Sequence, residues 1–338
     1  MISFVLRRAF WIVPVVLVVA AVTFFMMHQA PGGPWDLEKP MPQAAVDQLN
    51  ARFGLDKPSW VNVGGVADEW GEGERNPLSL TGTLVDTQFF HYIGRLLKFD
   101  LGPTYESRGG ENVQDVIQRQ FPVSLRIGLV AIVFASIVGI PLGAISALRQ
   151  NSWVDYLSVM ISSVGISVPT FVSGLLLLIF LSQNFGISPI KRPEAWKGVF
   201  SSAYIVPGII LGLGTMAYIA RLTRSSVLEI KRYDFVRTAR SKGVTERNVV
   251  FRHVLRNALL PVVTILGPAA ADLITGSIII ETIFNAPGLG KTFVTAIAKR
   301  DYSLIMGVTV FYSVIIAVAN VLVDIAYVYI DPRMRTRR

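Results

Sequence analysis

The sequence contains no cysteine, only three histidines and few charged residues, and each shortage argues against a class of function. Without cysteine the chain can form no disulfide, no thiolate metal site and no cysteine nucleophile. His28, His91 and His253 lie far apart in the sequence, which argues against a histidine-based metal site. No Ser-His-Asp set or pair of carboxylates points to hydrolysis. The sequence therefore does not predict an enzyme.

Long hydrophobic runs accompany this low charge. Charged residues make up 16% of the 338 residues, against about 25% in an average soluble domain. Hydrophobic residues make up 52%, and the mean hydropathy is +0.50. Several mostly apolar runs of about twenty residues predict an all-α polytopic membrane protein in contact with lipid. The net charge of +9 lies in segments beside these runs, which indicates membrane topology and not nucleic-acid binding.

The apolar runs predict six transmembrane helices, over residues 9–27, 121–148, 154–183, 203–220, 258–283 and 304–330. Two arginines precede the first run. A signal peptide would have a shorter apolar stretch and an A-x-A cleavage site, so we interpret this run as a retained first span. Gly139, Pro141 and Gly143 predict a kink in the second span, and Pro169 lies near the middle of the third.

These spans divide the chain into three regions: a first transmembrane helix (1–30), an extracytoplasmic segment or small domain (31–118) and a five-helix core (119–338). The core contains a basic loop over 227–257. The extracytoplasmic segment is enlarged and carries thirteen Asp/Glu and seven Lys/Arg among turn-rich stretches such as PGGP. Within it, AAVDQLNARFGL and TQFFHYIGRLLKF each predict an amphipathic helix, whereas residues 60–80 predict an irregular loop.

The distribution of charge predicts which side of the membrane each loop occupies. From Arg221 to Arg256 the chain carries ten Lys/Arg and three Asp/Glu. Basic loops are retained in the cytoplasm. With six spans, this loop and both termini are therefore predicted to be cytoplasmic, and the tail DPRMRTRR, with four arginines, agrees.

The basic loop has the pattern of a helical hairpin. Phe235, Val236 and Ala239 share one face of a helix, and Gly243 permits the backbone angles of a sharp turn. A second helix then leads into the fifth span, so the turn projects furthest into the cytoplasm. Such a hairpin is a candidate docking surface for a soluble partner. The alternative is a solvated basic hairpin that only enforces topology.

RTARSKG, at 237–243, resembles the EAA loop of ABC importer permeases, whose pattern is Glu-Ala-Ala, three residues and Gly. Ala239 and Gly243 match this pattern, and the Arg-Thr-Ala form is typical of the oligopeptide/dipeptide/nickel branch. Of the I-x-L-P sequence that follows in the generic pattern, only Leu255 fits. FGLDKP, FDLGPTY, ETIFNAPGLGKTF and VDIAYVYIDPRMR resemble the same branch. The resemblance covers almost the whole chain and is to the first, B-type, permease subunit.

The resemblance implies a type I ABC importer permease fold in a bacterial or archaeal cytoplasmic membrane. In that family the short helix of the loop sits in a cleft of a cytoplasmic ATPase and transmits its nucleotide-driven closure. The implied docking residues are Arg237, Thr238, Ala239, Lys242 and Gly243. The implied partners are a second homologous permease, two ATPases that bind ATP and Mg, and an extracytoplasmic solute-binding protein, with no cofactor in this chain. The implied cargo is an oligo- or dipeptide, with a nickel complex or a sugar as alternatives.

NAPGLGKT, at 285–292, nearly matches the phosphate-binding loop G-x-x-x-x-G-K-[ST]. Asn285 stands where the first glycine is required, no strand precedes the segment, and it falls on the predicted outer face. We interpret it as a tight Pro-Gly turn that caps a helix and not as a nucleotide site.

Asp272 lies inside the fifth predicted span, where a carboxylate is costly and marks a functional hypothesis. With Thr275 and Ser277 it is predicted to line a translocation path, where it could meet the amino terminus of a peptide. The alternatives are a carboxylate partnered by Arg126 or a hydroxyl, and small residues that let helices approach closely. Asp324, in the last span, is interpreted as the partner of a basic group. An ion-coupled secondary transporter, the alternative class, would need more ionisable groups within the spans.

Overall fold

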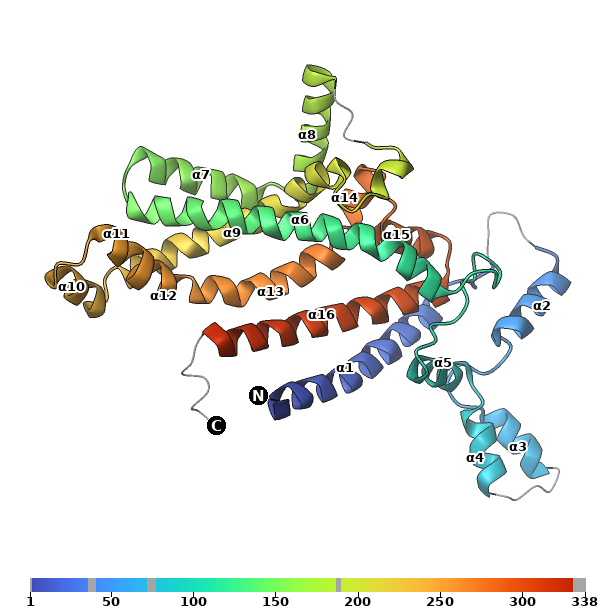
Figure 1. Cartoon of the computed structure of the whole chain (residues 1–338). Coiled ribbons are helices and arrows are strands. Elements are labelled where there is room, and N and C mark those ends of the chain that lie inside the picture. Colours follow the sequence, from blue (N-terminus) through green and yellow to red (C-terminus); the bar gives the residue numbers. More distant parts are fainter. Residues whose placement is uncertain (1, 36–40, 72–76, 187–189, 331–338) are drawn as a thin grey trace. The chain divides into compact units, whose positions relative to one another are not determined.

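The computed structural model of the chain describes residues 2–35, 41–71, 77–186 and 190–330 (Figure 1). These ranges are helices and their connections, apart from an isolated β-bridge between Pro103 and Asn112, which confirms the all-α prediction. The chain divides into a core unit (residues 1–6, 120–291 and 315–338) and an N-terminal unit (residues 7–119 and 292–314). The basic tail DPRMRTRR and the side chain of Asp324 lie outside the described part.

The core unit contains most of the long helices. Their bounds are α6 (Val113–Leu148), which begins in the N-terminal unit, α7 (Trp153–Ser167), α8 (Thr170–Phe185), α9 (Ile205–Ile230), α10 (Asp234–Ser241), α11 (Glu246–Asn248), α12 (Arg256–Ala258), α13 (Leu260–Thr275) and α14 (Ile278–Ile283). Two short 3-10 turns, η1 (Pro193–Trp196) and η2 (Ser202–Tyr204), precede α9, and a π-helical segment, η3 (Val249–Leu255), follows α11. α6 begins before its predicted start and α9 continues past its predicted end, because their outermost turns are polar and an apolar-run criterion omits them.

Within the described ranges, five helices are long and apolar enough to cross a membrane: Phe10–Gln29, Val113–Leu148, Ser202–Ile230, Leu260–Ile283 and Tyr302–Val323. The third predicted span is instead broken into α7 and α8, which meet at 106°. Val168 between them is extended, with φ −84° and ψ 120°, because a residue before proline avoids helical angles. With 15 and 16 residues, α7 and α8 are each shorter than the about 20 residues of a spanning helix. The count of six spans therefore stays a prediction.

α6 and α9 approach each other along a seam of glycines. α6 presents Gly139 and Gly143, and α9 presents Gly208 and Gly212, so each helix carries the small-xxx-small spacing of closely packed membrane helices. A Cβ added at Gly212 would lie 2.6 Å from a backbone oxygen of α6, and one at Gly139 would lie 2.7 Å from a backbone oxygen of α9. The glycines that predict a kink in α6 thus lie at a helix contact.

The N-terminal unit consists of shorter helices around the ends of two long ones. Its elements are α1 (Ile2–Gln29), α2 (Gln43–Phe53), α3 (Val63–Gly71), α4 (Pro77–Val85), α5 (Gln88–Leu97), most of α15 (Leu289–Ala298) and the first part of α16 (Tyr302–Ile330). α2 and α5 confirm the two predicted amphipathic helices. The irregular loop predicted over 60–80 is wrong, because α3 and α4 occupy most of it and pack on each other. Such tertiary pairing outweighs the low helix propensity of their glycines.

An aromatic cluster holds this unit to the end of α1. Phe24 of α1 is 2% exposed, and its ring stacks on His28 with centroids 3.9 Å apart. The same ring meets Trp60 at 5.0 Å and Phe89 at 5.3 Å in edge-on contacts. Since Trp60 and Phe89 flank the α3–α4 pair in sequence, the segment after α1 folds back onto the helix from which it emerges.

Candidate functional site

The basic loop forms a helical hairpin at the end of α9 (Figure 1). α10 follows Tyr233 and ends before Gly243, whose φ of 75° lies in the left-handed region that commonly ends helices. The N–H of Gly243 donates to the carbonyl of Arg240 at 2.9 Å, and that of Val244 to the carbonyl of Ala239 at 3.3 Å. The chain then returns through α11 and η3 toward α13. The predicted helix, turn and second helix are thereby confirmed.

α10 has one buried face. Val236 is fully buried and Ala239 is 6% exposed, and both belong to a cluster with Ala147 of α6 and Val227 of α9, together with residues of the returning helix. Phe235 was predicted to share this face, but its exposed fraction is 42%. Adjacent residues on a helix point about 100° apart, so burial of Val236 turns Phe235 toward the edge. We call this cluster the hairpin core.

Of the five residues implied as docking residues, four lie on the surface and one is buried beneath it. Arg237, Thr238, Lys242 and Gly243 are exposed, whereas Ala239 lies in the hairpin core. Arg237 lies 3.8 Å from Asp234 of the same helix, and the Asp234 side chain is almost fully exposed. The motif therefore supplies a basic outer surface and a small buried residue that positions it.

Polar contacts fix the hairpin at its turn and at its base. Across the turn, Arg240 donates twice to the Glu246 carboxylate, at 2.7 and 3.1 Å. The Arg240 guanidinium lowers the pKa of Glu246, and the carboxylate raises the pKa of Arg240. At the base, Lys231 Nζ donates to the carbonyl of Ala147 at 3.3 Å. The first contact closes the turn, and the second joins the end of α9 to the end of α6.

The returning half of the hairpin contains a π-helical segment, η3, which no sequence signal predicts. Val249 and Val254 of this segment are fully buried in the hairpin core. π-helical turns are rare and occur frequently at functional sites. η3 links the exposed turn to α13, the helix that carries Asp272.

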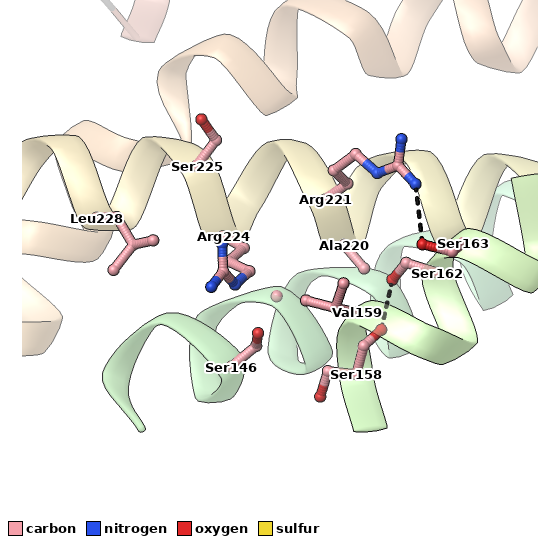
Figure 2. Close-up of a pocket in the computed structure, with 11 residues that line it drawn as sticks. Ser146, Ser158, Val159, Ser162, Ser163, Ala220, Arg221, Arg224, Ser225 and Leu228 are labelled. Carbon is pink, nitrogen blue, oxygen red and sulfur yellow. Dashed lines mark hydrogen bonds between the residues drawn. The ribbon is translucent and has the colours of Figure 1, made fainter. Parts of the chain in front are cut away.

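A buried ion pair joins three helices next to the hairpin. Asp155, in the first turn of α7 with a side chain 2% exposed, accepts from Nε and Nη2 of Arg224 on α9 at 2.7 and 2.9 Å. It also accepts from the Ser146 hydroxyl of α6 at 2.5 Å and from the Asn151 N–H at 2.9 Å. Figure 2 shows Arg224 reaching from α9 toward Ser146. One carboxylate thus ties α6, α7 and α9 together.

The ion pair borders a cavity of about 520 Å³ between these helices (Figure 2). Serines of α7 line it, and Arg221 donates to one of them, Ser163, at 3.3 Å. Ser158 and Ser162 donate their hydroxyl protons to backbone carbonyls one turn earlier. Those two hydroxyls therefore present only acceptor lone pairs to the cavity.

Asp272 of α13 lies beside a second cavity, of about 400 Å³, which Thr170 of α8 and Thr215 of α9 also line. Asp272 is exposed, and no cation pairs with its carboxylate in the part of the chain that the structure describes. Arg126, one partner considered from the sequence, donates instead to the Tyr204 hydroxyl at 3.0 Å. The pairing of Asp272 with Arg126 is therefore wrong.

The two hydroxyls grouped with Asp272 have other partners. Thr275 donates to a backbone carbonyl one turn earlier at 2.9 Å. Ser277 is fully buried and donates to the carboxylate of Glu281. Of residues 272–277, Asp272, Leu273 and Gly276 line the cavity, whereas Thr275 and Ser277 do not.

The near match to a phosphate-binding loop is occupied by a carboxylate of the chain itself. Glu281 is fully buried and accepts from the Lys291 N–H, in the first turn of α15, at 2.8 Å. The Leu289 N–H donates to the Ser124 hydroxyl at 2.9 Å. N–H groups at a helix start are where a phosphate would bind, and Gly288 leaves room for the carboxylate there. The interpretation as a helix-capping turn is confirmed, and Glu281 is the cap.

Replacing Gly288 by alanine is expected to lower the free energy of unfolding by about 1–3 kcal/mol, because the added Cβ would overlap the Glu281 carboxylate. Thermal unfolding of the purified full-length protein in detergent measures the effect. Gly198→Ala is the control, since its Cβ would meet nothing closer than 3.6 Å. Equal unfolding temperatures for the two variants would show that Glu281 does not need this space.

The apolar helices, the broken third span and the hairpin built on a buried core define a polytopic membrane protein with an exposed basic surface. A family model described as "Binding-protein-dependent transport system inner membrane component" matches residues 139–336. The chain belongs to this family. It is therefore a multi-pass inner membrane protein that works with other ABC transporter components.

Relatives of known name match over the full length of the chain. It is 37% identical over 339 residues to "Dipeptide transport system permease protein DppB" of Bacillus subtilis (strain 168), with 100% of this chain and 99% of the relative covered. It is 34% identical over 335 residues to "Oligopeptide transport system permease protein OppB" of Salmonella typhimurium, with 99% and 100% covered. The chain is a permease subunit of an ABC importer and not an enzyme.

Solved structures show the same fold at low sequence identity. A structure described as "Crystal structure of an amino acid ABC transporter with histidines" matches with a TM-score of 0.51 and 17% identity, covering 63% of this chain and 94% of that one. A structure of the MetNI methionine ABC transporter matches with a TM-score of 0.50 and 17% identity, covering 64% and 97%. These similarities support the permease fold.

Proposed function

We propose that this subunit forms half of a translocation path for peptides, with a second homologous permease forming the other half. The full-length relatives are named for dipeptide and oligopeptide transport. The cavity beside Asp272 supports a polar path, because an unpaired carboxylate attracts the amino terminus of a peptide. A nickel complex or a sugar is the alternative cargo.

The hairpin over 233–256 couples this path to ATP hydrolysis on a partner. The observation that carries this proposal is a basic surface, formed by Arg237, Thr238, Lys242 and Gly243, on a helix whose other face packs on α6 and α9. A push on such an anchored helix moves the long helices beneath it. The basic residues attract an acidic partner surface.

The proposed assembly contains two permeases, two ATPases that hold ATP and Mg, and an extracytoplasmic solute-binding protein. The concentration of basic residues between Arg221 and Arg256 supports a cytoplasmic hairpin. Six spans then place both termini in the cytoplasm and the segment over 31–118 outside. The docking proposal and this orientation support each other, since ATP is available on the cytoplasmic side.

Combining Arg237→Glu with Lys242→Glu is expected to lower both substrate-stimulated ATPase activity and uptake of a labelled dipeptide at least about tenfold. Like charges across an interface cost several kcal/mol, of which about 1.4 kcal/mol accounts for a tenfold loss. Both activities are measured on the complex in proteoliposomes. Lys98→Glu, an exposed charge reversal outside the hairpin, is the control and should keep both activities.

Mass spectrometry of the gently extracted complex establishes its composition beforehand. Absence of ATPases and of a second permease would contradict the assembly. Wild-type activity in the Arg237, Lys242 variant would contradict the docking surface. Uptake of nickel or a sugar without uptake of peptides would contradict the cargo but leave the coupling proposal intact.

A further inference from the structure

The N-terminal unit contains a cavity of about 320 Å³ that the proposed transport function does not use. Its walls come from the end of α1, from α2 and α5, from the loop before α6 and from the start of α16. Arginine, lysine and histidine side chains line it, and no aspartate or glutamate of the described ranges does. The cavity therefore has a cationic lining.

Arg52 and Arg95 bring two guanidinium groups to this cavity. Among the residues that the structure describes, neither side chain forms a salt bridge or a hydrogen bond. Each lies against a glycine of the loop between α5 and α6. A Cβ at Gly109 would lie 3.0 Å from Nη2 of Arg52, and one at Gly102 would lie 3.0 Å from Nη1 of Arg95. The loop backbone thus packs against two guanidinium groups whose N–H donors have no partner among the described residues.

Asp86, an acidic residue close to the cavity, is already paired with cations. Asp86, which does not line the cavity, pairs with Lys57 at 2.5 Å and with His91 at 2.6 Å. These hydrogen bonds hold the pKa of Asp86 below its usual range. Tyr92 lines the cavity, is 4% exposed and has a hydroxyl without a partner in the described ranges. Burial raises the pKa of this hydroxyl, which keeps it a proton donor.

His28 also lines the cavity, and both of its ring nitrogens already have partners. The Gln88 amide nitrogen donates to the carbonyls of Leu55 and Lys57, at 3.1 and 2.6 Å, which orients the amide. Its oxygen then faces His28 Nε2 at 3.0 Å, while His28 Nδ1 faces the carbonyl of Phe24 at 2.9 Å. Both ring nitrogens are therefore directed at acceptor oxygens of the protein, and neither is left to accept a hydrogen bond from a ligand.

We propose that this cavity binds the phosphate of an anionic phospholipid headgroup through Arg52 and Arg95. Planar guanidinium groups bind phosphate oxygens through paired N–H donors. Basic pockets beside transmembrane helices bind anionic lipid headgroups by this chemistry. The Tyr92 hydroxyl is positioned to be a further donor in the same cavity.

The position of the cavity along α1 identifies a lipid as the source of the phosphate. Phe24 and His28 lie in the last two turns of the apolar stretch Phe10–Gln29. A span leaves the hydrocarbon at this level, where headgroups lie. Phe24, Phe53 and Met306 add an apolar wall that a glycerol backbone and the first acyl carbons can cover and a free phosphate cannot.

The test uses the full-length protein, with whatever importer subunits stay bound, in nanodiscs of phosphatidylcholine with increasing phosphatidylglycerol. Native mass spectrometry counts the retained phosphatidylglycerol, and thermal unfolding reports stabilisation. Arg95→Gln is expected to weaken retention about fivefold, and Arg52→Gln with Arg95→Gln about 25-fold, since each cation near a membrane surface contributes about a factor of five. Lys98→Gln is the control, an exposed cation that follows α5 outside the cavity.

Retention of phosphatidylglycerol by the wild type and Lys98→Gln, with loss in the arginine variants, supports the site. Arg52→Lys with Arg95→Lys should bind at an intermediate level, because the charge stays and the paired donors are lost. Equal stabilisation by inorganic phosphate in pure phosphatidylcholine would assign a free anion and overturn the lipid. The double glutamine variant should unfold at the wild-type temperature in pure phosphatidylcholine. If it then retains as much phosphatidylglycerol as the wild type, the site is overturned.

Discussion

Asp155→Asn is expected to lower the free energy of unfolding by about 3 kcal/mol, the larger part of it through Arg224. The substitution removes the charge that accepts both guanidinium N–H groups, and only 29% of the Arg224 side chain is exposed to solvent that could replace it. Removing one member of a buried ion pair strongly destabilises a protein, because the other charge stays buried without a partner. Denaturant unfolding of the purified protein in detergent measures the change.

A double variant separates the ion pair from its surroundings. Asp155→Asn with Arg224→Met removes both charges and should recover at least about half of the lost stability, because no unpaired charge remains. Asp234→Asn is the surface control, since that carboxylate is 96% exposed and lies 3.8 Å from its partner. If the single and double variants are equally unstable, the carboxylate acts through Ser146 and the backbone and not through Arg224.

Gly143→Ala is expected to cost about 3 kcal/mol or more, and to reduce the yield of monodisperse protein severely. The added Cβ would overlap the carbonyl oxygen of Ala220 on α9, and a backbone atom can move only if the whole helix moves. Overpacking a close contact typically costs about 1–3 kcal/mol where side chains can adjust, and here none can. Yield after size-exclusion chromatography and the unfolding temperature measure the effect.

Gly214→Ala provides the matched comparison within the membrane helices. Its Cβ would meet nothing closer than a backbone oxygen at 3.7 Å, an ordinary contact distance. It should express and unfold like the unmodified protein. Similar losses at positions 143 and 214 would mean that glycine matters here for backbone flexibility and not for the approach of α6 to α9.

The hairpin could be predicted from the sequence because its determinants are local. Gly243 and the apolar residues beside it specify helix, turn and helix within a short stretch, and the structure reproduces that order. The resemblance of 237–243 to a known loop identified the surface. It could not show that Ala239 is buried, since burial depends partly on Ala147 of α6, which lies far away in the sequence.

The ion pair of Asp155 and Arg224 illustrates what sequence reasoning missed. Ser152 caps α7 through the Asp155 N–H, so the Ser-x-x-Asp spacing signals a helix start. Nothing in that pattern points to an arginine 69 residues further on. A clue was available in principle, because a carboxylate beside an apolar run needs a partner. The identity of that partner depends on the packing of α7 on α9.

The break between α7 and α8 shows the same limit in the backbone. Pro169 predicts an interruption of the third span, and the extended Val168 follows from the proline alone. The angle of 106° does not, because it depends on the helices against which each half packs. For a similar reason the helices α3 and α4 were predicted as loop, since each is short and they pack as a pair.

The glycine seam between α6 and α9 also constrains how this chain can evolve. At Gly143 and Gly212 the obstruction is a backbone oxygen, so no second substitution elsewhere can make room for a larger residue. At Gly208 the nearest atoms are the side-chain carbons Cγ1 and Cβ of Val130, 2.5 and 2.6 Å from the added Cβ, so that only glycine at 130 would remove both overlaps. Homologous chains should therefore vary at 208 only together with 130, and keep glycine at 143 and 212.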